Sequence, residues 1–318
     1  MIKTRAIRKI FVTSLSLFIF LFITTFFHFN TDNTLRTNLE IASPSGLYTD
    51  TIYLLNERNL LVKSKVLLDE VDLKDKIIDL LDKLTVKKND YLPNGLFTYI
   101  PKNTEVLNVV LGDGLVTVDF SKEFLKMKLH LEKQIISGIV YSILELDNKL
   151  EGVVILVEGE VFLEYPNTHE KLDSPLTKKI GINEEYNLTS RKDINRVVIY
   201  YLSRINNDIY YVPVTKYVND SRDKIKIIID ELASSVIYED NLMSFLHSNV
   251  KLLDYYEEGG VFFLNFNDYL FDSDDKVLEE VLYSISYSVF DNYDVNQVMF
   301  EVNDNFIGQV FSDGTIKK

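Results

Sequence analysis

Histidine is the side chain that most often acts as a general base, and this chain of 318 residues contains four of them. They are His28, His130, His169 and His247. A serine nucleophile needs such a base within reach, and none of the four is accompanied by a nucleophile motif such as Gly-x-Ser-x-Gly. The sequence therefore predicts solvated or locally hydrogen-bonded histidines and no catalytic one.

Paired carboxylates are the second group that could do chemistry, as the acid and base of a hydrolase acting on wall glycans. The pairs are Asp119 with Glu123, and Glu158 with Glu160. Residues two apart on a strand share one face, which is what we expect for Glu158 and Glu160. A second, similar segment of the chain has Asn303 and Asn305 in their place. We therefore expect polar residues that end a buried strand rather than a catalytic pair.

Side-chain oxygens also gather in one segment that resembles a calcium loop in composition only. It contains Asn265, Asn267, Asp268, Asp272, Asp274 and Asp275. The segment lacks the Asp-x-Asp-x-Asp-Gly spacing of an EF-hand and its glutamate at position twelve. Zinc ligation has no support either, because the chain has no cysteine and no His-Glu-x-x-His sequence. We expect a helix start with Asp274 near the N-cap, and predict no catalytic, cofactor-binding or metal residue.

The elements that would position any site come in two copies, about 146 residues apart. Residues 112–120, Gly-Asp-Gly-Leu-Val-Thr-Val-Asp-Phe, correspond to residues 258–266, Glu-Gly-Gly-Val-Phe-Phe-Leu-Asn-Phe. In both, an Asp-Gly or Gly-Gly turn separates an apolar strand from a strand that ends in Phe. These dipeptides tolerate the positive φ angles of a tight hairpin, which accounts for the glycines without a phosphate-binding loop.

Both copies have the pattern β-β-α-β-β-α-β. The first has predicted strands at 51–55 and 60–68, a helix at 73–84 with Asp72 as N-cap, a hairpin at 105–120, a helix at 131–144 and a strand at 153–157. The second has strands at 197–202 and 210–218, a helix at 223–232, a hairpin ending at 266, a helix at 276–290 and a strand at 298–302. The sequence thus predicts an α+β fold: two tandem similar modules, each with helices on one face of a sheet.

Aromatic residues are frequent in the strands of the second copy. They are Tyr200, Tyr201, Tyr210, Tyr211, Phe262, Phe263 and Phe266. Because successive side chains of a strand point to opposite faces, about half of them should lie in the core. The others are candidates for a face that binds a partner or stacks on a glycan, since exposed tyrosine is enriched at interfaces.

One hydrophobic segment, residues 10–29, precedes the two copies and is long enough to cross a bilayer of about 30 Å. Its basic flank, Lys3, Arg5, Arg8 and Lys9, predicts a cytoplasmic N-terminus and an extracytoplasmic remainder. The segment is longer than the usual hydrophobic region of a cleaved signal peptide, and it lacks a cleavage site of small residues. We therefore expect an uncleaved single-pass anchor in the cell membrane. The predicted domains are a basic tip and transmembrane helix at 1–30, a polar spacer at 31–50, repeat 1 at 51–163, a linker at 164–195 and repeat 2 at 196–311. The linker is long for a plain connector, and we expect it to hold the two modules together.

The charge of the chain limits its partners. The net charge is −14, and four positive charges precede the hydrophobic segment, so the remainder carries about −18. Nucleic acids bind through phosphate neutralisation and should be repelled by so acidic a surface. Anionic lipid headgroups and anionic wall polymers should be repelled as well.

The first copy resembles the GerMN domain family in three motifs that occur in the family's order. They are Ile-Pro-Lys-Asn-Thr-Glu-Val-Leu at 100–107, Gly-Asp-Gly at 112–114 and Val-Asp-Phe-Ser-Lys-Glu-Phe at 118–124. Residues 156–160 and 174–177 are similar to the end of such a domain. In the second copy, residues 211–218 resemble the opening hairpin, and 264–266 are a weaker version of Val-Asp-Phe. Two departures are the lack of a lipoprotein cysteine and Leu-His-Ser-Asn at 246–249 in place of an Ile-Pro-Lys segment.

This resemblance covers about residues 51–309 and implies an envelope protein linked to sporulation, germination or wall assembly. It also implies a fold similar to the ring-building modules of secretion-like complexes, and it implies no enzymatic mechanism. We therefore expect a non-enzymatic scaffold that binds an envelope or membrane protein or associates with itself. The alternatives are a module that binds peptidoglycan fragments or another wall ligand, and, third, a cell-wall hydrolase. No cofactor is expected.

Overall fold

The computed structural model describes residues 50–70, 72–87, 92–93, 95–234, 242–272, 274 and 276–318, which all belong to one compact unit. No helix within these residues is both long and apolar enough to cross a membrane. The predicted anchor at 10–29 and most of the polar spacer lie outside the described residues, as do His28 and Asp275.

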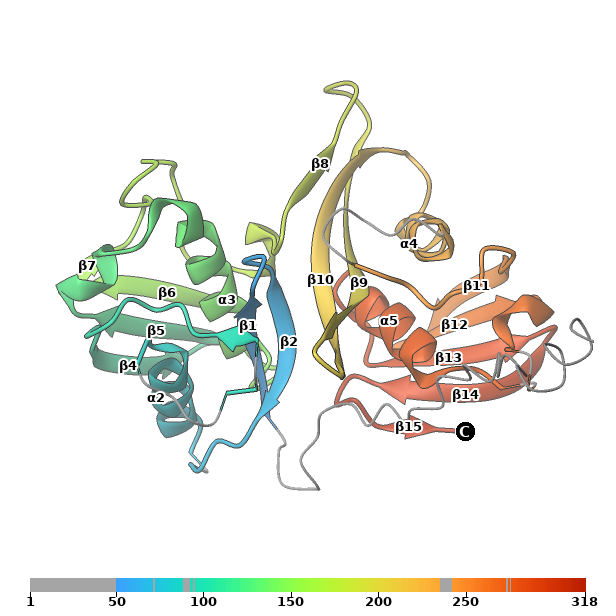
Figure 1. The fold of residues 1–318 in the computed structure, drawn as a ribbon, viewed down its shortest axis with the longest axis horizontal. Helices are drawn as coiled ribbons and strands as arrows, with labels where there is room; N and C mark the ends of the chain where they lie inside the picture. Colours follow the sequence, from blue (N-terminus) through green and yellow to red (C-terminus); the bar gives the residue numbers. More distant parts are fainter. Residues whose placement is uncertain are drawn as a thin grey trace, which may run out of the picture. The chain divides into compact units, whose positions relative to one another are not determined.

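Repeat 1 follows the predicted order of elements (Figure 1). It comprises β1 (Asp50–Asn56), β2 (Leu61–Val66), α2 (Leu73–Leu84), β3 (Leu96–Phe97), β4 (Val106–Gly112), β5 (Leu115–Phe120), α3 (Glu132–Leu144), β6 (Gly152–Val157) and the short β7 (Glu160–Val161). Asp72 caps α2 as predicted, because its carboxylate accepts a hydrogen bond from the backbone N–H of Lys74.

Repeat 2 has the same order except that it has no named strand equivalent to β3 and ends with one additional strand, β15. It comprises β9 (Ile194–Ile205), β10 (Asp208–Asn219), α4 (Lys224–Ala233), β11 (Leu252–Glu258), β12 (Val261–Phe266), α5 (Glu279–Phe290), β13 (Gln297–Val302), β14 (Asn305–Phe311) and β15 (Ile316–Lys317). The two predicted hairpin turns are confirmed, with positive φ angles at Asp113 and Gly114 and at Gly259 and Gly260.

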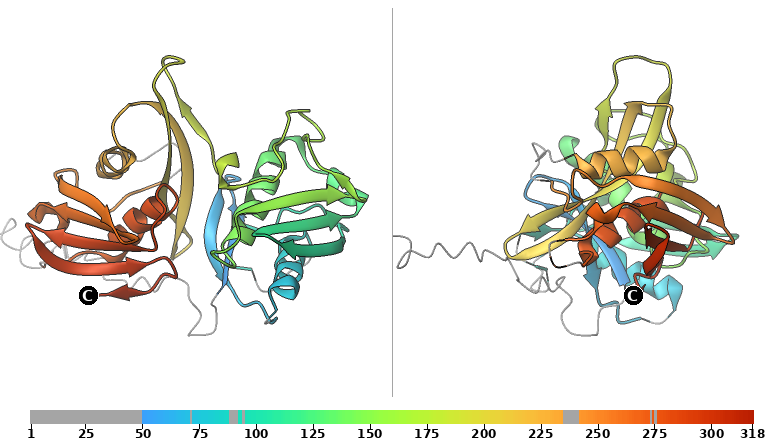
Figure 2. Two further views of the ribbon diagram at one scale, coloured as in Figure 1. Left: turned by 180° about the vertical axis from the view of Figure 1, so that it is seen from behind. Right: turned by 90° about the vertical axis from the view of Figure 1, so that its right-hand side faces the viewer.

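The prediction of one sheet per module is wrong, because each module divides its strands between two sheets. The second part of each repeat forms its own sheet, in the order β4-β5-β6-β7 or β11-β12-β13-β14-β15. The second helix of each repeat, α3 or α5, lies between that sheet and the opening hairpin (Figures 1 and 2). Helix α3 is buried from Ile135 to Ile143 because β1 covers one side and β6 another. A helix that is apolar all round needs cover on more than one side, which a single sheet face does not give.

The opening hairpins of the two repeats meet in a shared six-stranded sheet. Its order is β3-β1-β2-β10-β8, where β8 (Glu185–Asn187) is a short strand of the linker, and β9 also pairs with β10. Strands β2 and β10 are antiparallel and pair at Lys63 and Tyr211. Lys63 pairs with Tyr53 in its hairpin as Pro213 pairs with Tyr200, so Lys63 corresponds to Pro213 and, by the same register, Leu61 corresponds to Tyr211. The two hairpins therefore meet through corresponding stretches that run in opposite directions.

The linker contributes to both repeats. Leu176 forms a β-bridge with Val153 of β6. A single-turn helix at Lys178–Ile180 follows, and then β8 (Glu185–Asn187) pairs in parallel with β10. The segment predicted as a linker is therefore built into the shared sheet rather than lying free between two domains.

Candidate functional site

The three described histidines lie apart from one another in local contacts. His130 is exposed in a short helical turn. His169 Nδ1 lies 3.2 Å from Glu164 Oε1, and His247 Nδ1 accepts a hydrogen bond from the Asn249 N–H while its ring stacks on Tyr269. His130 is therefore exposed to solvent, and His169 and His247 are locally hydrogen-bonded.

The carboxylate pairs are hydrogen-bond acceptors for turns. Glu158 Oε1 accepts from the Lys122 N–H at 2.9 Å, and Asp119 Oδ1 accepts from the Gly159 N–H at 3.0 Å. Glu158 does not share a strand face with Glu160, contrary to our expectation, because Glu158 adopts φ 51° in the tight turn between β6 and β7. In repeat 2, Asn265 takes the place of Asp119 and accepts from the Asp304 N–H at 3.1 Å.

The oxygen-rich segment that begins in β12 at Asn265 forms hydrogen bonds with other residues of this chain. Asn303 and Asp304 each bond to one member of it, Asp268 and Asn265 respectively. Asp274 is not the N-cap of α5, which begins at Glu279 with Leu278 before it. Instead the Asp272 carboxylate accepts from the N–H groups of Asp274 and Lys276, which closes a turn ahead of the helix. The described residues contain no group of three or more His, Asp or Glu side chains that could hold a metal ion.

The aromatic residues of repeat 2 do not divide evenly between core and surface. Six of the seven named above are buried, and Phe263 alone among them is partly exposed. The even division predicted from alternation is wrong because β9 and β10 are covered on both faces. Helices α4 and α5 lie on one side of this hairpin, and repeat 1 lies against β10 through β2.

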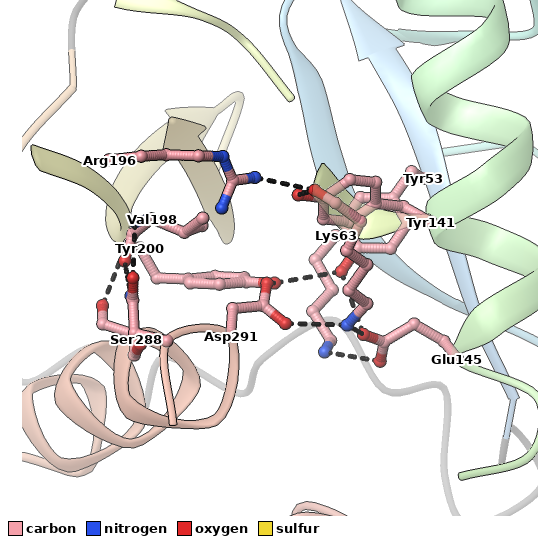
Figure 3. A network of polar contacts seen from close by, with 11 residues as sticks. Tyr53, Lys63, Tyr141, Glu145, Arg196, Val198, Tyr200, Ser288 and Asp291 are labelled. Atoms are coloured by element: carbon pink, nitrogen blue, oxygen red, sulfur yellow. Dashed lines mark hydrogen bonds and ion pairs between the residues drawn. The ribbon is translucent and has the colours of Figure 1, made fainter. Parts of the chain in front are cut away.

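The structure brings together a polar network that we call the joint: Tyr53, Lys63, Ser142, Glu145, Lys178, Tyr200, Ser288 and Asp291. Figure 3 labels all of these residues except Ser142 and Lys178. Its two halves are equivalent in the repeats. The backbone N–H of Tyr53 donates to Ser142 Oγ at 3.0 Å, and that of Tyr200 donates to Ser288 Oγ at 2.9 Å. The hydroxyls of the two tyrosines then meet at 3.1 Å, where the two repeats come into contact.

A carboxylate from each repeat closes the joint, and one lysine of the linker joins them. The Tyr53 hydroxyl donates to Glu145 at 3.3 Å, and the Tyr200 hydroxyl donates to Asp291 at 2.7 Å. Lys178 Nζ lies 2.9 Å from Glu145 Oε1 and 2.7 Å from Asp291 Oδ1. Lys63 Nζ adds a second ammonium group, 2.8 Å from the other oxygen of Glu145. Charges of both repeats and of the linker are therefore neutralised in one cluster.

The electrostatics of the joint keep Glu145 ionised. Burial by itself would raise the pKa of Glu145, but the ammonium groups of Lys178 and Lys63 outweigh it and hold this pKa far below its usual range. Burial would likewise lower the pKa of Lys178, and Asp291 with Glu145 raises it instead. The single ammonium group of Lys178 contacts one carboxylate oxygen of each repeat, so this ion-pair geometry links the two repeats.

The backbone of Lys178 is fixed as firmly as its side chain. Its carbonyl oxygen accepts from Arg196 Nη2 at 2.7 Å and from the Tyr141 hydroxyl at 3.1 Å. The ammonium group is thus presented to Glu145 and Asp291 by a segment with little freedom, which lowers the entropy cost of forming both ion pairs.

Asn183 forms a second connection between the repeats. Its side chain accepts from the Leu61 N–H at 2.9 Å and donates to the carbonyl oxygens of Leu61 at 2.8 Å and Pro213 at 2.7 Å. Leu61 belongs to β2 and Pro213 to β10, so one amide group satisfies backbone atoms of both repeats. Asn183 adopts φ 46°, a conformation that asparagine tolerates better than most residues.

A cavity of about 1020 Å³ lies beside the joint. Its lining combines carboxylates, amides, lysines and aromatic rings, among them Lys63, Glu145, Tyr200, Tyr287, Phe290 and Asp294. Lys63 also lies over the Tyr287 ring, 4.4 Å from its centroid. Charged groups, amides and aromatic rings are thus brought together in the lining of one cavity.

The ionic part of the joint should be stable over a wide pH range. Because the pKa of Glu145 is lowered, its contribution to the free energy of unfolding is present above the unfolded value, roughly 4.3, and is lost as pH falls below it. The raised pKa of Lys178 gives a contribution that is present below about pH 10.4 and is lost as pH rises further. Urea unfolding of the full-length protein and of Glu145→Gln should therefore differ most between about pH 5 and 10 and converge in acid. A difference that stays constant down to pH 3 would contradict this assignment.

Sequence reasoning did not find the joint. Glu145 and Asp291 stand 146 residues apart and each follows the last turn of the second helix of its repeat. Acidic residues are unfavourable at helix C-termini, so their presence at both equivalent positions was a signal that a cation must lie nearby. The position of that cation, Lys178, is set by the linker and has no counterpart in the repeat pattern.

The fold and the joint define a class of protein: two similar α+β modules held as a tandem by one shared sheet and a buried ionic network. A family model described as Germane, sporulation and spore germination, matches residues 51–162 and 198–307. These segments make up more than half of the chain, and the chain belongs to this family. The resemblance to GerMN domains inferred from the motifs is confirmed.

This chain is similar to one curated protein and to one solved structure of the same family. The spore germination protein GerM of Bacillus subtilis (strain 168) is 29% identical over 222 residues, which are 68% of this chain and 60% of that protein. The chain thus spans about 60% of the length of the curated relative. A solved structure of the tandem GerMN domains of the sporulation protein GerM from Bacillus subtilis has a TM-score of 0.72 and 26% identity, and the match covers 80% of this chain and 91% of that one. The chain is a GerM-like protein of tandem GerMN domains.

Proposed function

We propose that this protein is a membrane-anchored, extracytoplasmic and non-enzymatic interaction protein of the bacterial cell envelope that acts in sporulation, germination or wall assembly. The observation that supports this most is the joint. Two modules that each expose sheet edges are held by Lys178, Glu145 and Asp291 in one arrangement. A tandem fixed in this way presents two surfaces at a constant separation, which suits a protein that bridges partners.

The chemistry of the described residues supports a role without catalysis. The carboxylates of Glu145 and Asp291, which share Lys178, are satisfied by ammonium and hydroxyl groups. The histidines described above lie in separate local contacts and face no activated nucleophile. Exposed apolar side chains are present on the outer strands β4 and β11, where Leu107 is 48% exposed and Leu253 is 52% exposed. Exposed apolar groups of this kind favour binding to another macromolecule.

A second candidate function is the binding of a wall glycan or peptidoglycan fragment, and the cavity beside the joint favours it. Its ring and amide lining resembles the mixture that sugar ligands require, with apolar faces to stack on and polar groups to bond to hydroxyls. This alternative places the ligand between the repeats, whereas the scaffold proposal places partners at the sheet edges.

Photo-cross-linking in intact cells distinguishes the two functions. A photoreactive amino acid at Leu107 or at Leu253 should capture the same envelope or membrane protein, or this protein itself, in stoichiometric yield. One placed at Asn148, in the lining of the cavity, should capture none. Capture of muropeptides at Asn148, with none of a protein at either edge, would favour the glycan-binding function and overturn the scaffold. Release of soluble sugar from wall material by the purified full-length protein would overturn both.

A further inference from the structure

Strand β11 forms an open edge of the sheet in repeat 2. Within the described part of the chain it pairs with β12 alone, along its length from Leu252 to Glu258. The residues from Leu253 to Glu258 are exposed except Tyr255, which is partly covered by its bond to Asp223 and by Lys226. An unpaired strand of this length offers backbone N–H and C=O groups to another extended segment.

The face of the sheet that points away from α4 and α5 carries an apolar row next to this edge. Tyr256 pairs with Phe263, and Phe263 pairs with Met299, so the row crosses three adjacent strands. The Tyr256 and Phe263 rings are stacked with centroids 4.4 Å apart and an angle of 8° between their planes. Tyr256 is 48% exposed, and the row therefore ends at the open edge with a ring that a further strand could cover.

Carboxylates surround that ring on the same face. Asp254 and Glu258 lie two residues before and after Tyr256 on β11, and Glu301 lies on β13 opposite Asn265. Burial and then the carboxylates Glu301, Glu258 and Asp254 raise the pKa of the Tyr256 hydroxyl. Three negative charges around one exposed ring make this edge electrostatically selective for a cationic partner.

Repeat 1 has an equivalent edge with fewer carboxylates on this face: the edge strand itself has none there, and Asp119 of the neighbouring β5 accepts a hydrogen bond from the Gly159 N–H. Strand β4 is the equivalent open edge, and positions 108, 110 and 112 correspond to 254, 256 and 258. They are Asn108, Val110 and Gly112, and the row behind Val110 is Thr117 and Val154. The two edges therefore share geometry and differ in chemistry, so the chain contains its own control.

We propose that the β11 edge binds an extended, basic segment of a partner protein, which adds a strand to the sheet. This inference deepens the proposed function and rests on it. The segment would place an apolar side chain beside Tyr256 and a lysine or arginine beside each of Asp254 and Glu258. The required pattern is cation, any residue, apolar, any residue, cation, and it reads the same in both chain directions.

The same charges argue against other occupants. A second copy that offered its own β11 would place Asp254 and Glu258 near acidic residues of equal sign, which destabilises a strand pair. Acidic polymers are repelled for the same reason. A neutral extended segment would form backbone hydrogen bonds equally well at β4 and at β11, whereas a basic segment should bind more tightly at β11.

The test uses the full-length protein in detergent and the capped peptide Thr-Lys-Thr-Tyr-Thr-Lys-Thr as probe. Binding is measured by the anisotropy of the labelled peptide, and its site by amide hydrogen exchange. We expect slower exchange in residues 252–258 and unchanged exchange in residues 106–112. The same peptide with both lysines changed to glutamate should bind at least about tenfold more weakly at low salt. A peptide with proline at the inner threonines should also lose binding, because it cannot donate the ladder hydrogen bonds.

Matched variants make the result specific to the edge. Tyr256→Ala and the pair Asp254→Asn with Glu258→Gln should each weaken binding about fivefold or more, and the charge variant should reduce its salt dependence. Val110→Ala, the equivalent change in repeat 1, should leave binding unchanged. The proposal is overturned if the glutamate peptide binds as tightly as the lysine peptide. It is also overturned if the peptide slows amide exchange in residues 106–112 instead of 252–258. A third contrary result would be slower exchange in residues 252–258 at higher protein concentration without any peptide. Failure here together with protein capture at Leu107 or Leu253 in cells would leave the scaffold function standing.

Discussion

Replacing Lys178 with methionine is expected to loosen the joint and to lower the free energy of unfolding by about 2 kcal/mol. The change leaves Asp291, whose side chain is 5% exposed, without a counter-charge. Removing one partner of a buried ion pair typically costs roughly 3–5 kcal/mol, and the smaller figure reflects that Lys178 is 33% exposed. Urea unfolding of the full-length protein measures the stability. Because the chain has no cysteine, spin labels at Lys126→Cys and Lys251→Cys report the distance between the repeats, whose distribution should broaden.

Two controls decide whether the effect belongs to the joint. Lys171→Met removes an exposed lysine that pairs with Glu164, and it should change stability by less than about 0.5 kcal/mol. Adding Asp291→Asn to Lys178→Met should recover part of the loss, because the neutral amide no longer needs a cation. The coupling between the two changes should be about 1–2 kcal/mol. Strictly additive effects, or an unchanged label distance in Lys178→Met, would show that the bridge does not hold the repeats.

Replacing Asn183 with alanine is expected to destabilise the protein by about 3 kcal/mol. The change removes hydrogen bonds to Leu61 and Pro213 and leaves the buried N–H of Leu61 without its acceptor. It also places alanine at φ 46°, which costs about 1 kcal/mol of backbone strain. Urea unfolding measures the total, and hydrogen exchange should show the loss at β2 and β10 rather than in the outer sheets.

Asn183→Gly separates these two contributions, since glycine adopts positive φ without strain but makes no side-chain hydrogen bond. It should cost about 2 kcal/mol. Asn103→Ala provides the converse control, because Asn103 is exposed and has φ 66°, so that only the backbone contribution is lost. If Asn183→Ala and Asn103→Ala prove equally costly, the amide group of Asn183 does not connect the repeats.

The order of elements could be predicted from the sequence because it depends on local rules. The 3.6-residue period identified α2 and α3, and Asp72 supplied the first cap. Turns such as Asp113-Gly114 were recognisable because few residues accept positive φ angles. The duplication itself needed only a comparison of the chain with itself, and the motifs at 100–124 were sufficient to place the chain in its family.

The division of each repeat into two sheets could not be predicted from those rules. The apolar sequence of α3 indicates that the helix is buried, but it does not indicate whether one sheet or two sheets pack against it. Alternation along β9 and β10 likewise gave no sign that both faces are covered, so about half of the aromatic residues in the strands of repeat 2 were expected outside the core. Burial of the second face depends on repeat 1, which lies far away in the sequence.

The sequence by itself determined the two repeats, their secondary structure, the acidic charge and the family. The tertiary structure decided how the repeats join, and with that which polar residues matter. Lys178, Glu145 and Asp291 are separated by 33 and 113 residues along the chain, and no local pattern links them. They meet because the linker is bonded to both repeats and because buried charges are stable only where opposite charges can be brought beside them. The tertiary structure places these opposite charges beside one another, and the order of residues along the chain does not show which of them will meet.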